Sequence, residues 1–109
     1  MNYQDERKKI GTQTQVATLL GISHFTLSNR ECGRQEVRLE HLLAFAAIRG
    51  KLPKGKISRA SYKKMRTRLG SRAVVGKLLG VTETCLSYRE NGKVVIKMEM
   101  TLALRELNN

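Results

Sequence analysis

Basic side chains are the most numerous chemically active groups in this sequence. The chain has 21 Lys and Arg residues against 9 Asp and Glu residues, a formal net charge of +12. So much positive charge repels itself in a compact molecule, and it is usually retained because the partner is a polyanion. Nucleic acid is the first candidate for that partner, and an anionic membrane surface is the second.

Groups that act as nucleophiles or metal ligands are few. There are two cysteines, Cys32 and Cys85, and two histidines, His24 and His41. Their number and spacing fit neither a disulfide framework nor a tetrahedral metal site, and free thiols in a reducing cytoplasm are the simplest interpretation. The sequence also has no nucleophile–base set, paired carboxylates or phosphate-binding loop. We therefore expect no enzyme activity, no metal and no cofactor.

The sequence lacks the apolar segments that membrane proteins and secreted proteins carry. No apolar run approaches the roughly 20 residues that span a bilayer. The N-terminal stretch MNYQDERKKIG has no apolar core of the kind found in a secretory signal. These features predict a cytoplasmic protein with no membrane partner.

The chain repeats itself with an offset of 59 residues. The match runs without a gap over 47 positions, beginning at Asn2 and Ser61. The stretch LLGISHFTLSNRECG returns as LLGVTETCLSYRENG, in which the flanks are kept and the middle changes. We interpret this as a tandem duplication with three segments: a first unit over residues 1–48, a basic connector over 49–60 and a second unit over 61–109.

Capping residues and apolar spacing predict an all-α protein with four helices in each unit. The first three helices of each unit have a capping residue before them and a glycine after them. In the first unit Gln15 completes a capping box with Thr12. The N-caps and closing glycines of both units are Asn2, Thr12, Ser23, Gly11, Gly21, Gly33, Ser61, Ser71, Thr82, Gly70, Gly80 and Gly92.

A fourth helix follows in each unit. In RLEHLLAFAAI, the residues Leu39, Leu42, Leu43 and Ala46 recur at helical spacing and predict an apolar face. The second unit repeats this helix as KMEMTLALREL, with Met98, Leu102 and Leu107 at that spacing. We interpret the methionines of this stretch as core residues.

The second and third helices of each unit are separated by three residues that begin with glycine, which is typical of a helix-turn-helix. In the first unit the apolar residues Val16, Leu20, Ile22 and Leu27 have the spacing that this motif requires. The helices touch at Ala17, or at Gly76 in the second unit, so that position must be small. Gly21 and Gly80 are expected to have positive φ.

The stretches TQTQVATLLGISHFTLSNRECG and SRAVVGKLLGVTETCLSYRENG resemble the Cro/repressor (Xre-type) helix-turn-helix family. The resemblance covers both units and implies two lambda-repressor-like units that form an internal pseudo-dimer. Three features depart from the family pattern. A usually apolar position is Arg30 or Arg89, the segment before the motif is one residue short, and a fifth helix is absent or replaced.

The resemblance implies that the third helix of each unit enters the major groove, with its first turn nearest the bases. Asn29 suits adenine, His24 can donate to guanine, and Glu83 can accept from the cytosine amino group. Phe25 can lie against a thymine methyl group. The implied base-reading residues, which differ between the units apart from a shared serine, are His24, Phe25, Ser28, Asn29, Glu83, Thr84, Ser87 and Tyr88.

Contacts to DNA phosphates are expected from helix N-termini and from basic residues after each motif. The connector RGKLPKGKISR adds an expected exposed basic strap. The expected phosphate ligands are Gln13, Ser23, Arg34, Arg38, Lys51, Lys54, Lys56, Arg72, Thr82, Lys93 and Lys97.

The resemblance also implies two structural pairs. In the family, an arginine of the first helix pairs with a glutamate that closes the recognition helix. Arg7 with Glu31, and Arg66 with Glu90, would be those pairs, and we expect them to hold the fold rather than to contact DNA.

The leading hypothesis is a sequence-specific double-stranded DNA-binding protein, a small repressor of a phage or plasmid-type mobile element. One chain would act as a pseudo-dimer on a bipartite operator. An antitoxin-like protein is the alternative, with one unit on DNA and the other on a partner protein. Residues 1–48 carry six basic and five acidic side chains, whereas residues 49–109 carry fifteen and four, so the first unit would bind the partner. A protein that marks a transfer or replication origin is a third possibility.

Overall fold

A computed structural model describes residues 2–51 and 57–108 of the chain, and these residues form eight α-helices and no β-strand. The all-helical expectation is therefore confirmed for the described residues. None of their helices has the length and apolar character that crossing a membrane requires. The helices are α1 (Tyr3–Ile10), α2 (Gln13–Leu20), α3 (His24–Glu31), α4 (Leu39–Arg49), α5 (Arg59–Leu69), α6 (Arg72–Leu79), α7 (Glu83–Asn91) and α8 (Met98–Asn108).

Most helices begin and end at the predicted signals. Asn2 and Ser23 accept hydrogen bonds from backbone N–H groups at the starts of α1 and α3. Thr12 and Gln15 form a complete capping box at the start of α2. These caps satisfy backbone N–H groups that have no partner inside a helix. Helices α1, α2 and α3 have only eight residues each, and their starts are therefore well defined.

The start of α5 differs from the prediction. Ser58, not Ser61, is the N-cap, because the Ser58 side chain accepts a hydrogen bond from the Ser61 N–H at 3.2 Å. Helix α5 therefore begins three residues before Tyr62, whereas α1 begins at the equivalent residue Tyr3. Arg49 belongs to α4, and α5 begins at Arg59, so both ends of the expected connector are helical.

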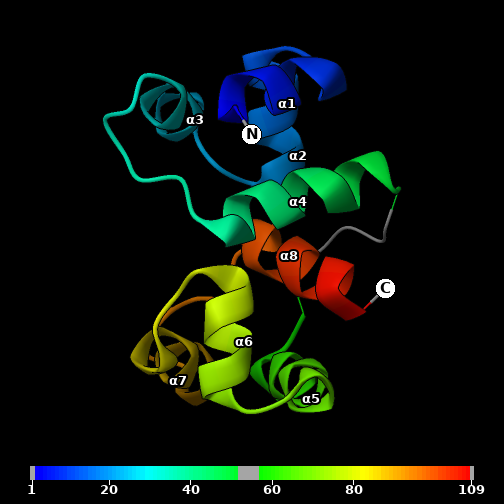
Figure 1. Ribbon diagram of the computed structural model, residues 1–109, viewed down its shortest axis with the longest axis vertical. Coiled ribbons are helices and arrows are strands. Elements are labelled where there is room, and N and C mark those ends of the chain that lie inside the picture. Colours follow the sequence, from blue (N-terminus) through cyan, green and yellow to red (C-terminus); the bar gives the residue numbers. More distant parts are fainter. Residues whose placement is uncertain (1, 52–56, 109) are drawn as a thin grey trace.

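The molecule has two similar halves, α1–α4 and α5–α8, with α4 and α8 at its centre (Figure 1). Among the described helices, α4 and α8 make the most extensive contact. Each half has its own hydrophobic core, but the halves exchange one leucine. Leu102 of α8 is fully buried in the core of the first half, and its repeat equivalent Leu43 of α4 packs against the core of the second half.

The predicted core face of α4 is correct at two of its four positions, since Leu42 packs against the first core and Leu43 against the second. It is wrong at Leu39 and Ala46, which are exposed, whereas Ala44, Phe45 and Ile48 are buried. The helix is apolar on nearly every side, so periodicity alone could not distinguish the face toward its own half from the face toward α8. The prediction for the methionines of α8 is confirmed, since Met98 and Met100 pack against the two cores.

The turns after α2 and α6 bring the two halves into close contact. Gly21 and Gly80 have φ of +71° and +72°, as predicted. A Cβ atom at Gly21 would lie 3.3 Å from the Cβ of Met98 in α8, and one at Gly80 would lie 3.0 Å from the backbone N of Leu39 in α4. Each turn therefore lies against the other half.

We expect Gly80→Ala to destabilise the protein more than Gly33→Ala. Gly33 also has positive φ, at +81°, but nothing lies within 4 Å of a Cβ placed there. Gly33→Ala should therefore lower the free energy of unfolding only by the backbone term of about 1–2 kcal/mol. Gly80→Ala should cost at least about 1 kcal/mol more, because α4 must shift. Urea unfolding of both variants measures the difference, and equal losses would contradict the close contact.

Candidate nucleic-acid interface

Helices α3 and α7 lie on one side of the molecule, near its two ends (Figure 1). The N-terminal ends of α4 and α8 lie between them on that side, which we call the α3/α7 face. The Cα trace measures 34 × 27 × 23 Å along its principal axes, and Figure 1 looks down the shortest axis. The two helices are therefore separated mainly along the long direction.

All eight predicted base-reading residues are accessible on α3 and α7. Leu27 and Leu86 are fully buried, which directs the opposite sides of these helices outward. The Phe25 side chain is 79% exposed, an unusual position for an apolar ring. The exposed residues are His24, Phe25, Glu83, Thr84 and Tyr88, and the half-buried ones are Ser28, Asn29 and Ser87.

Several predicted phosphate ligands are exposed in the loops that end at α4 and α8. Arg34 and Lys93 follow the closing glycines, and Arg38 and Lys97 directly precede the two central helices. The Lys93 ammonium lies 5.1 Å from the centre of the Tyr88 ring, so a basic group and an aromatic face are presented together. Ser23 and Thr82 are exposed, and their hydroxyls cap α3 and α7.

Other predicted phosphate ligands have a different position. The Arg72 guanidinium pairs with Glu90 at 3.3 Å, and Gln13, with Arg7, helps to lower the pKa of Glu31, so both residues are engaged with internal carboxylates. Lys51 follows the C-terminal end of α4, about 16 Å along that helix from its N-terminal end. It therefore lies away from the α3/α7 face. Lys54 and Lys56 lie outside the described residues.

The two expected structural pairs are in contact within their own halves. Arg7 binds both oxygens of Glu31, at 2.9 Å each, and Arg66 binds both oxygens of Glu90, at 2.9 and 2.8 Å. Each arginine also donates to the carbonyl of the glycine that closes its own helix. Two-pronged contact of this kind fixes orientation as well as distance, so α1 is tied to α3 and α5 is tied to α7.

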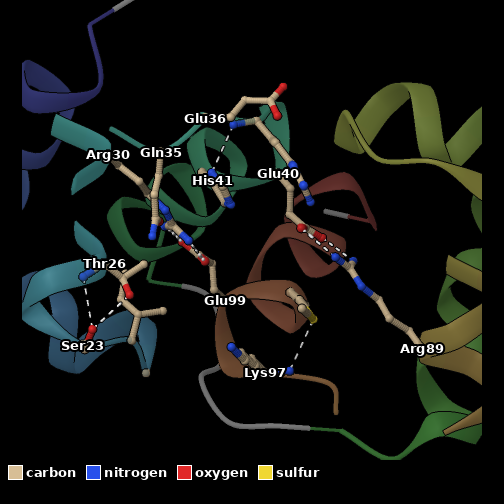
Figure 2. A pocket seen from close by; sticks show the side chains of 14 residues that line it. Ser23, Thr26, Arg30, Gln35, Glu36, Glu40, His41, Arg89, Lys97 and Glu99 are labelled. Atoms are coloured by element: carbon tan, nitrogen blue, oxygen red, sulfur yellow. Dashed lines mark hydrogen bonds and ion pairs between the residues drawn. The ribbon is translucent and has the colours of Figure 1, made fainter. Parts of the chain in front are cut away.

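A second set of ion pairs crosses between the halves (Figure 2). Arg30 of α3 binds both oxygens of Glu99 in α8, at 2.7 and 3.0 Å. Arg89 of α7 binds both oxygens of Glu40 in α4, one of them at 2.9 Å. All four residues are buried. Arg30 and Arg89 can thus be buried because each has a carboxylate partner in the other half.

A tyrosine completes each crossed pair. Arg30 donates to the Tyr3 hydroxyl at 3.1 Å, and Arg89 donates to the Tyr62 hydroxyl at 2.9 Å. Burial raises the pKa of both tyrosines to about 12, so they remain protonated at neutral pH. These clusters were not predicted from the sequence motifs. The available signal was that the arginine, glutamate and tyrosine are each identical in both repeats.

The crossed pairs line a cavity of about 610 Å³ on the α3/α7 face (Figure 2). Arg38 and Lys97 also line it, and no ion pair forms to either among the described residues. Within each crossed pair the arginine and the glutamate neutralise each other. The net charge of the cavity lining is therefore positive, because Arg38 and Lys97 outweigh Glu36. Burial, with the nearby charges of Arg30, Arg38 and Arg89, lowers the pKa of His41 to about 3, so His41 is neutral.

We expect Glu40→Gln to lower the free energy of unfolding by about 3–5 kcal/mol, because Arg89 would be left as an uncompensated buried charge. Glu6→Gln is the control, since Glu6 pairs at the surface with Lys9 and Arg49. Its loss should be about 1 kcal/mol or less. Chemical denaturation of both variants makes the comparison. Similar losses would show that the crossed pair contributes no more than a surface pair.

The depressed pKa of His41 predicts that the free energy of unfolding decreases as the pH is lowered below 6.5, the ordinary pKa of histidine. Between pH 6.5 and about 3 the unfolded chain binds a proton that the folded protein excludes. The histidine should therefore cost about 1.4 kcal/mol between pH 7.5 and 5.5. His41→Met should remove this dependence, because Met100 occupies the equivalent place and accepts a hydrogen bond from Lys97 N–H. An unchanged pH profile in the variant, from denaturation at each pH, would exclude His41 as its cause.

Comparison with protein-family models, with curated proteins and with solved structures gives no match to this chain. The assignment of function therefore depends on the side chains that the α3/α7 face presents.

Proposed function

We propose that this protein binds double-stranded DNA in a sequence-specific manner, with α3 and α7 as the recognition helices of two helix-turn-helix units. The observation that carries the proposal is the pair of exposed, dissimilar helix faces on one side of the molecule. Polar side chains suited to base edges stand on α3 and α7, and cations lie between the two helices. This arrangement fits contact with bases at two places and with phosphates between them.

The placement of the two helices supports engagement of one side of a duplex. Helices α3 and α7 lie on the same side of the molecule, near the ends of a long axis that measures 34 Å over the whole Cα trace. Both can therefore face one duplex, at a separation below the roughly 34–36 Å between the recognition helices of two-fold proteins. A single chain thus supplies both helices in the manner of a pseudo-dimer.

The different side chains on α3 and α7 favour an asymmetric bipartite site. Asn29 of α3 corresponds to Tyr88 of α7, and His24 corresponds to Glu83. A perfect palindrome would present one of the two helices with the wrong bases. Binding of such a site within a promoter would block transcription, and we therefore assign the protein as a small repressor, of the kind that mobile elements encode.

A partner-binding role for the first half is the second candidate function, as in an antitoxin. An apolar groove between α4 and α6 favours it. Leu39 and Leu78, at 51% and 43% exposed, line this groove. Their repeat equivalents Met98 and Leu19 are partly buried against the first core. The two halves therefore differ in exposed apolar surface.

Selection of bound sequences from random duplex DNA tests the proposal directly. We expect the protein to enrich one bipartite sequence with two different halves, and the complex to contain one chain per duplex by analytical ultracentrifugation. Enrichment of a single half-site would favour the antitoxin-like function. The absence of any enriched sequence would contradict the proposed function.

On the selected duplex, Asn29→Ala should relax base preference in one half-site and Tyr88→Ala in the other, each at a cost of about 1–3 kcal/mol in binding free energy. Lys51→Ala is the matched control, because Lys51 lies away from the α3/α7 face, and it should not change base preference. Titration of duplexes mutated in each half measures these effects. If both substitutions acted on the same half-site, the pseudo-dimer assignment would be wrong.

A further inference from the structure

We infer that Glu99 and Glu40 are positioning residues for base recognition, each acting on the recognition helix of the other half. This inference rests on the proposed function. It assigns to α8 a role in the half-site read by α3, and to α4 a role in the half-site read by α7.

The crossed pairs attach directly to the base-reading segments. Arg30 follows Asn29 in α3, and Arg89 follows Tyr88 in α7. The bidentate contacts of Arg30 fix both the distance and the plane of its guanidinium group relative to Glu99. Because α3 has only eight residues, a displacement of Arg30 is transmitted to Asn29 within the same turn.

The contacts within each half do not connect α3 to α8 or α7 to α4. The Arg7–Glu31 pair and buried Leu27 tie α3 to its own half at the end and middle of the helix. Neither contact involves α8. The Arg30–Glu99 pair, with Tyr3 as a second acceptor, is the hydrogen-bonded link between α3 and the other half among the described residues.

Recognition requires tight placement. A binding group must be held within about 0.5 Å and 10–20° of its productive geometry. A buried arginine follows its carboxylate, since leaving it unpaired is costly. Shortening Glu99 by one methylene should therefore move α3 while the charge pair persists.

Glu99→Asp and Glu40→Asp form a matched pair of variants that test the inference. Both keep the carboxylate, so both should fold, and thermal unfolding with circular dichroism verifies this. Base discrimination is then measured on the selected duplex with single-base changes in each half. We expect Glu99→Asp to lower discrimination at least fivefold in the half-site read by α3, with less than twofold change in the other. Glu40→Asp should show the reverse pattern, and Glu6→Asp should change neither half-site.

A purely structural role for these glutamates would give a different result. Loss of stability alone would lower discrimination equally in both half-sites, or lower only total affinity, and either result would overturn the inference. The inference would also be overturned if each substitution lowered base discrimination in the half-site read by the recognition helix of its own half. If the unmodified protein selected no sequence, the proposed function itself would fail.

Amide spectra of the free protein provide a readout that needs no DNA. In ¹H–¹⁵N correlation spectra, Glu99→Asp should shift the Ser28 and Asn29 amides of α3 and leave the Ser87 and Tyr88 amides of α7 in place. Glu40→Asp should do the opposite. Unchanged α3 amides in Glu99→Asp would overturn the inference even if DNA binding were altered.

Discussion

The rest of the structure depends on the need to pair two buried arginines. Arg30 of α3 and Arg89 of α7 face the protein interior, where an unpaired charge is strongly unfavourable. The carboxylates that pair with them, Glu99 and Glu40, belong to the central helices of the opposite halves. Neither half therefore supplies the carboxylate that pairs with its own buried arginine. These arginines can be buried only when the two halves are paired. Apolar packing alone would not impose this requirement.

Apolar contacts and close backbone contacts around the crossed pairs also reach from each half into the other. Leu102 is buried in the core of the first half, and Leu43 packs against that of the second. The turn glycines Gly21 and Gly80 leave room for the starts of α8 and α4. Like the crossed pairs, these contacts connect α8 to the first half and α4 to the second half. The relative position of α3 and α7 is thus fixed by several interactions that act together.

The two halves share a frame and differ in the surfaces that they expose. The structural arginines, glutamates and tyrosines are the same in both repeats, whereas the outward side chains of α3 and α7 differ. Charge differs as well, with most of the excess positive charge in the second half. A duplicated protein that reads two unlike half-sites would require this division, because a helix can change its outward side chains without disturbing the buried contacts that hold it.

The sequence by itself determined the local structure: Thr12 and Gln15 specify the start of α2, and the glycines end the helices, because these signals act over a few residues. It also indicated which side chains of α3 and α7 point outward, since Leu27 and Leu86 had to be buried. Only the tertiary structure decided the partner of Arg30, the buried face of α4 and the distance of Lys51 from the α3/α7 face. These features depend on how α4 and α8 pack across the repeat, and the pairing of residues 69 positions apart, such as Arg30 and Glu99, leaves no periodic signal in the chain.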